Sequence, residues 1–105
     1  MAINNIKETI TSFEEMSRAF VGREPKTSVD TCDIAVLRSV LSMLNLPDNN
    51  LDASQCSQIS SILTFLGRID LFSDSQDAQS IIVEISTRIT DIRGQFNGAL
   101  EGVPR

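Results

Sequence analysis

Apolar residues recur every three or four positions along most of the chain, which predicts α-helices rather than strands. The clearest example is "SIIVEISTRITDIRGQF", residues 80–96, where isoleucine, a residue common in strands, keeps a helical spacing. Steps of four and three alternate without a gap through Ala78, Ile82, Ile85, Ile89, Ile92, Phe96 and Ala99. A seam that keeps a seven-residue repeat predicts left-handed, coiled-coil-like packing against neighbouring helices.

The same spacing predicts four helices, at about 3–21, 31–45, 53–71 and 76–97, followed by a loose tail at 98–105. Three short polar breaks separate the helices. Two of these breaks contain a proline, Pro25 and Pro47, through which a helix cannot continue. Because short connections join antiparallel helices that lie side by side, we expect consecutive helices to be neighbours. The predicted fold is therefore a single all-α domain, an antiparallel up-down four-helix bundle.

Capping residues indicate where these helices begin. Asp52 and Gln55 have the spacing of a capping box, so Asp52 is the predicted N-cap of the third helix. The predicted caps of the other two internal helices are Asp30 or Thr31 for the second, and Ser73 or Ser75 for the fourth.

The charge of the chain limits its partners. With 14 acidic and 9 basic residues the net charge is −5, and the chain lacks the basic surface of a nucleic-acid binder. Anionic membranes would repel it for the same reason, and no apolar run reaches the length of about 18 residues that a membrane span needs. The first 20 residues contain no signal-peptide core, so we expect a cytoplasmic protein. A basic protein partner is favoured, although acidity also serves solubility alone.

The residue types that are missing exclude several chemistries. The chain has no His, which removes the usual general base and zinc ligand and excludes Ser–His and Cys–His catalysis within the chain. Its five glycines are scattered and form no phosphate-binding loop. Cys32 and Cys56 lie near the starts of two antiparallel helices, too far apart for an internal disulfide, and Cys56 is expected in the core. We therefore expect a protein that is not an enzyme and holds no cofactor or metal.

One short motif is similar to a known modification site. "DSQDA", residues 74–78, precedes "IIVEI" and resembles the D-S-L motif of acyl and peptidyl carrier proteins, small acidic helical bundles. The resemblance implies a phosphopantetheine arm attached to Ser75 at the start of the fourth helix. It covers only the residues around Ser75, and the Leu of the motif is Gln76 here, with one helix following where that family has more. A helix cap at Ser75 explains the same residues.

The outer faces of the second and third helices differ from those of an ordinary bundle helix, which carries alternating Glu and Lys. Most of their side chains are small and uncharged, namely Ser39, Ser42, Asn45, Ser57, Ser60, Ser61 and Thr64. Arg38 and Arg68 are the main charges. Removing water from small neutral groups costs little free energy, so a partner protein can cover these faces. The alternative is that the Ser and Thr residues reflect only a compositional preference of the organism.

From these faces we predict a non-enzymatic protein-interaction module: an adaptor, an inhibitor or immunity-type protein, or a chaperone-like regulator. It would bind another protein through the second and third helices. The first alternative is a self-assembling subunit, such as a homodimer, in which the first and fourth helices pair between copies. The second alternative is the carrier protein modified on Ser75.

Overall fold

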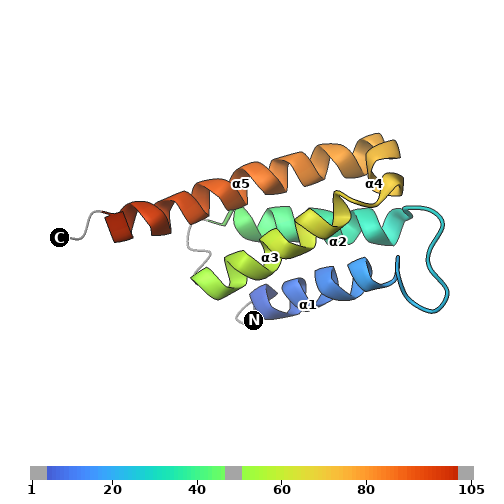
Figure 1. The fold of residues 1–105 in the computed structure, drawn as a ribbon, viewed down its shortest axis with the longest axis horizontal. Coiled ribbons are helices and arrows are strands. Elements are labelled where there is room, and N and C mark those ends of the chain that lie inside the picture. Colours follow the sequence, from blue (N-terminus) through green and yellow to red (C-terminus); the bar gives the residue numbers. More distant parts are fainter. Residues whose placement is uncertain (1–4, 47–50, 102–105) are drawn as a thin grey trace.

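The computed structural model describes residues 5–46 and 51–101, and within them all regular structure is helical (Figure 1). The predicted all-α class is therefore confirmed. Five helices follow one another along the chain: α1 Asn5–Arg18, α2 Thr31–Leu44, α3 Ala53–Leu66, α4 Asp70–Asp74 and α5 Gln76–Glu101.

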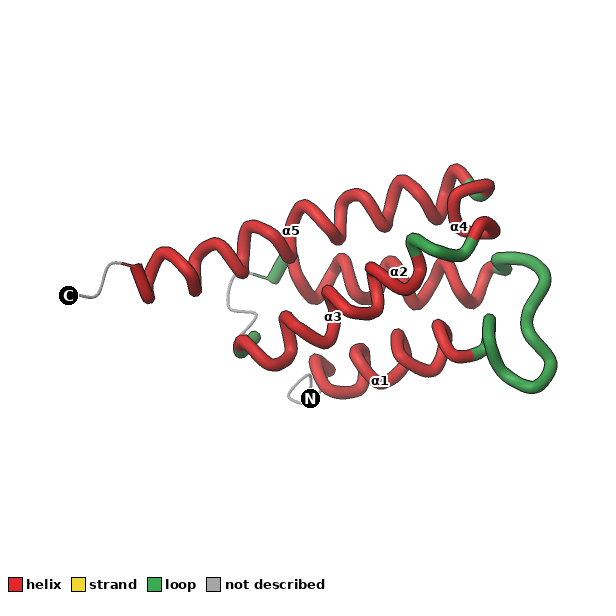
Figure 2. The backbone as a smooth tube through the Cα atoms, in the orientation of Figure 1, coloured by secondary structure: helices red, strands yellow, loops and turns green. Residues whose placement is uncertain are grey.

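The four longer helices run alternately back and forth along the long axis of the molecule. In Figures 1 and 2, α1 and α3 run from left to right, while α2 and α5 run from right to left. The principal contacts join α1 to α2 and α3, and join α5 to α2, α3 and α4. Helices α2 and α3 therefore lie across the molecule from each other, with α1 and α5 between them.

This pairing differs from the expectation that consecutive helices are neighbours. Within the described residues, α2 and α3 are not a principal contact pair, although they follow each other in the chain. The physical reason lies in their broad apolar faces, each of which is wide enough to pack against two helices. The apolar faces of α2 and of α3 each pack against both α1 and α5, and the two helices do not pack against each other as a principal pair.

One hydrophobic core joins all five helices. Its most completely buried large side chains come from each of the four longer helices: Phe13, Leu37, Leu44, Ile59, Leu66 and Ile85. The predicted seam of the last helix is buried at Ala78, Ile85, Ile89 and Ile92, and Ile82 is partly buried. The side chains of the seam positions Phe96 and Ala99 lie outside the described part of the chain.

Helix caps occur where the sequence predicts them. The Asp52 side chain accepts a hydrogen bond from the Gln55 N–H at 2.7 Å, and the Gln55 side chain accepts one from the Asp52 N–H at 3.1 Å. This confirms the predicted capping box. Of the paired alternatives, Asp30 caps α2, and at the start of α5 Ser75 Oγ accepts from the Ala78 N–H at 3.3 Å.

The third helix is shorter than predicted, which corrects the range 53–71. Helix α3 ends at Leu66, Gly67 forms its C-cap, and Ile69 has an extended backbone before the single turn of α4. The change of direction brings Phe72 into the core, where its ring lies 4.8 Å from that of Phe20. Burial of a large aromatic side chain outweighs the loss of one more helical turn.

The first helix also ends early, at Arg18 instead of residue 21. The chain tightens there into hydrogen bonds between residues three apart, from the Phe20 N–H to the Ser17 carbonyl and from the Val21 N–H to the Arg18 carbonyl. A tightened last turn of this kind satisfies carbonyls that the helix leaves unpaired. It also directs Phe20 into the core.

The fourth predicted helix is longer than the range 76–97. Helix α5 continues to Glu101, so the predicted loose tail is wrong for residues 98–101, and residues 102–105 lie outside the described part. A single Gly98 costs a helix only about 1 kcal/mol relative to Ala, which is too little to end it without a proline.

Candidate functional site

The residues predicted to bind a partner are at the surface. On α2 and just beyond it, four side chains are exposed, and we call them the α2 face: Arg38, Ser39, Ser42 and Asn45. A second group, the α3 face, is also exposed apart from the partly buried Ser60, and consists of Ser57, Ser60, Ser61, Thr64 and Arg68.

The fold does not bring these two groups together into one surface. Because α2 and α3 lie on opposite sides of α1 and α5, the solvent-facing sides of the two helices point in opposite directions. In Figure 1, α3 crosses obliquely in front of the middle of α2. The α2 face and the α3 face are therefore two separate surfaces.

Several hydroxyl groups on these faces already have a hydrogen-bond partner in the chain. Ser39 donates to the Ala35 carbonyl at 3.0 Å, and Thr64 donates to the Ser60 carbonyl at 3.0 Å. Ser60 Oγ accepts a hydrogen bond from Arg93 of α5 at 3.2 Å. A hydroxyl that already donates a hydrogen bond within the chain has a smaller desolvation cost when a partner displaces its water. The free-energy cost of covering these faces is therefore low.

The two faces carry no acidic side chain, and their charges are those of Arg38 and Arg68. No residue between Ala53 and Leu66 is charged, and Arg68 follows only after the end of α3. On α2 the exposed residues include one charge, Arg38, because Asp33 is buried. The exposed acidic side chains of the described residues therefore lie on other surfaces.

A groove runs between α1 and α2 beside the α2 face. A hollow of about 260 Å³ lies in it, lined by the following residues, which we call the α1–α2 groove: Glu8, Thr9, Ser12, Ala35, Val36 and Ser39. Sequence reasoning found Ser39 but missed the contribution of α1. The available signal was the spacing of Glu8 and Ser12, which places a charged and a small side chain on one flank of a helix.

A larger hollow, of about 670 Å³, lies on the first turns of α5. Only α5 lines it, through residues such as Gln76, Ser80 and Val83, and no second element forms an opposing wall. It is the surface of one helix, so it gives no basis for a binding site.

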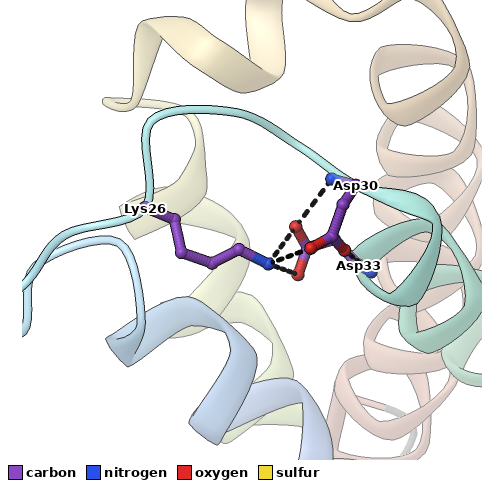
Figure 3. Close-up of polar contacts among 3 residues, drawn as sticks. All are labelled: Lys26, Asp30 and Asp33. Carbon is purple, nitrogen blue, oxygen red and sulfur yellow. Dashed lines mark hydrogen bonds and ion pairs between the residues drawn. The ribbon is translucent and has the colours of Figure 1, made fainter.

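An ion cluster joins the α1–α2 connection to the start of α2 (Figure 3). Lys26 Nζ donates to both carboxylate oxygens of Asp33, at 2.8 and 2.7 Å, and to Asp30 Oδ2 at 2.8 Å. The Asp33 side chain is only 4% exposed and also accepts a hydrogen bond from the Asp30 N–H at 3.0 Å. The cluster therefore fixes the end of a long loop to a buried carboxylate.

The two partially exposed members of this cluster have shifted pKa values. Burial by itself would lower the pKa of Lys26, but the hydrogen bonds and negative charges of Asp30 and Asp33 outweigh it, and the pKa is raised. The Asp30 carboxylate accepts hydrogen bonds from Lys26 and from the Asp33 backbone N–H, and these two bonds, the first most of all, lower the pKa of Asp30. Lys26 also lies 5.5 Å from the centre of the Phe20 ring, which adds a cation–π contact.

Arg88 connects α5 to the end of α2. Its Nη2 donates to the Leu44 carbonyl at 3.2 Å, and its Nη1 lies 3.8 Å from Asp91 Oδ2. A cation at the C-terminal end of a helix interacts favourably with the helix dipole, so Arg88 stabilises the α2–α5 contact. Its Nε is buried without a hydrogen-bond partner.

The two cysteines are the remaining candidate residues. Both cysteines are free, Cys32 exposed and Cys56 buried, and burial raises the pKa of the Cys56 thiol. In the part of the chain that the structure describes, no group of acidic, Cys or His side chains is arranged to hold a metal ion. None of the helices among those residues is long and apolar enough to span a bilayer.

No protein-family model, curated protein or solved structure matches this chain.

Proposed function

We propose that the protein is a non-enzymatic protein-interaction module, an adaptor, an inhibitor or immunity-type protein, or a chaperone-like regulator. It binds another protein through the α2 face and the α3 face. The observation that supports this proposal is the absence of acidic side chains from the α2 face and the α3 face in a chain of net charge −5. Depletion of charged residues is one of the features that distinguish the centre of a protein interface from ordinary surface.

The position of the two faces favours an adaptor. Since they point in opposite directions, a compact partner that covers one face cannot reach the other. Two proteins, one on each side, use both faces without any change in the bundle. The net charge of −5 favours partners with a basic rim, and this preference weakens as salt screens the charges.

A finer description of the fold accompanies this proposal. We take α1, α2, α3 and α5 to form a four-helix bundle with left-handed, coiled-coil-like crossing angles. In it α1 lies antiparallel to α2 and parallel to α3, and α5 lies antiparallel to α3 and parallel to α2. The alternating helix directions and the four-three spacing of the α5 seam support it. The two free cysteines fit a reducing compartment, and a cytoplasmic location belongs to the same proposal.

Affinity capture from the native host tests the proposal with one substitution on each face. Ser42→Arg and Ser61→Arg place a long cation on an exposed position of α2 and α3 without touching the core. Each variant should lose the partner of its own face and keep the other. Glu84→Arg, on the exposed side of α5, is the control and should keep both.

Circular dichroism must first show that the three variants are as stable as the wild type. If both face variants capture the same proteins as the wild type, neither face binds a partner and the proposal is wrong. If light scattering shows instead that the wild type is a homodimer that both face variants leave intact, the self-assembling alternative, in which α1 and α5 pair between copies, replaces it.

A further inference from the structure

We infer that the α1–α2 groove binds an amphipathic α-helix of another protein that carries basic side chains along one flank. This inference rests on the proposed function, since it assigns a partner chemistry and a position to the surface around α2. According to this inference, the centre of the partner-binding surface lies between α1 and α2 and not in the middle of the α2 face.

The shape of the groove fits a helix. Its walls are made of small side chains, with Thr9 and Ser12 on α1 and Ala35 and Ser39 on α2, and the partly buried Val36 completes the lining. Side-chain ridges of a helix pack into grooves of this kind, with helix axes about 8–10 Å apart. Small walls let the partner approach to the shorter end of that range, where dispersion contacts are most numerous.

The charged residue among those that line the groove is on α1. Glu8 lines the hollow, and Glu15, seven residues further on, lies on the same flank of α1 because seven residues make two helical turns. Both side chains are exposed, and neither forms an ion pair within the described residues. The third glutamate of α1, Glu14, differs, because Arg18 lies within 3.8 Å of it.

On the α2 side, Arg38 is the one charged residue between Ala35 and Ser39, and it is not among the residues that line the hollow. A partner helix that fits this pattern has small or aliphatic residues toward Val36 and two cations one heptad apart toward α1. A second copy of this chain fits poorly, since a two-fold contact through the groove would bring the same glutamates of both copies together.

A designed peptide provides the test. The probe is a synthetic helical peptide with an Ala and Leu face and two Lys residues one heptad apart on one flank, compared with the same peptide carrying Glu at those two positions. Binding is measured at low ionic strength from amide chemical shifts of the full-length protein. The Lys peptide should perturb the amides of Ser12, Val36 and Ser39, and the Glu peptide should not.

Charge reversal on α1 supplies the matched variants. Glu8→Lys with Glu15→Lys should weaken binding of the Lys peptide by roughly fivefold to tenfold and should allow the Glu peptide to bind. Glu84→Lys makes the same kind of change on α5 and should leave binding unchanged. The inference is wrong if both peptides bind equally, if the perturbed amides lie on α3, or if neither peptide binds at millimolar concentration.

The outcome separates this inference from the proposed function. If Ser42→Arg and Ser61→Arg lose captured partners while the Lys peptide does not bind the groove, the proposed function holds and the helix-binding groove is wrong. If the Lys peptide binds the groove and charge reversal acts as stated, but no partner is captured through either face, the inference holds and the proposed function is wrong.

Discussion

Replacing Lys26 with Met should destabilise the protein by leaving a buried carboxylate without its main partner. Lys26 gives Asp33 two short hydrogen bonds, and the Asp33 side chain is almost inaccessible to water. Met keeps most of the aliphatic stem of Lys26, so the change removes the charge more than the packing. The substitution therefore measures what the ion cluster contributes to folding.

The magnitude follows from the burial of the two partners. Removing one member of a buried ion pair costs about 3–5 kcal/mol, and a hydrogen bond to a charged group contributes about 1.5–3 kcal/mol. The Lys26 side chain is 28% exposed, and Asp33 keeps the hydrogen bond from the Asp30 N–H, so the cost falls below the fully buried case. We expect a loss of about 2 kcal/mol, or about 10 °C in Tm for a domain of this size.

The effect of Lys26→Met should depend on pH in a defined direction. The raised pKa of Lys26 gives stability that is complete below its ordinary value of 10.5 and is lost as the pH rises through the folded pKa. The lowered pKa of Asp30 gives stability that is complete above its ordinary value of 3.8 and is lost as the pH falls through the folded pKa. The difference between wild type and variant should be constant near neutral pH and shrink at both extremes.

Urea denaturation followed by far-ultraviolet circular dichroism is the appropriate assay, because the chain has no Trp or Tyr to report by fluorescence. A double-mutant cycle with Asp33→Asn isolates the pair, and the double variant should be less destabilised than the sum of the single variants by at least about 1 kcal/mol. A loss below about 0.5 kcal/mol for Lys26→Met, the size of an ordinary surface substitution, would refute the reasoning.

Three further substitutions or modifications test other parts of the structure. Asp52→Ala removes the side-chain cap of α3 and should cost about 1 kcal/mol in urea denaturation, whereas Asp52→Ser should cost little; equal losses would contradict the cap. A thiol reagent at pH 8 should modify exposed Cys32 quickly and buried Cys56 only after denaturant is added, and similar rates would show that Cys56 is accessible. Gly94→Ala should raise the free energy of unfolding by about 0.5–1 kcal/mol, since a Cβ at this helical position meets no atom within 4 Å; a lowered Tm would count against it.

Local signals in the sequence predict the helices well because the apolar spacing and the capping residues that define a helix lie within its own stretch of sequence. The α5 seam and the Asp52–Gln55 capping box are properties of nearby residues in the sequence. The capping box and the seam from Ala78 to Ile92 occur as predicted. The end of α3 was harder to predict, because Ile69 keeps the apolar spacing past Gly67. Only the position of Phe20, in the turn just after α1, explains why Phe72 turns inward there.

Features that depend on which elements meet were not predictable in the same way. The ion cluster joins Lys26 to Asp33 across the end of a loop, and no periodicity records a pairing of that kind. The groove needs α1 beside α2, and the pattern of each helix alone gives only its exposed flank. A sequence therefore indicates which residues are exposed before it indicates which exposed residues share a surface.

The pairing of helices changes how binding data on this protein should be interpreted. Had α2 and α3 been neighbours, their uncharged faces would have formed one surface, and substitutions on either helix would weaken the same complex. In the observed arrangement the two helices are separated by α1 and α5, so their substitutions are independent and should add without coupling. Strong coupling between Ser42→Arg and Ser61→Arg would require one partner that surrounds the bundle, which is the observation that would argue most directly against an adaptor with two separate faces.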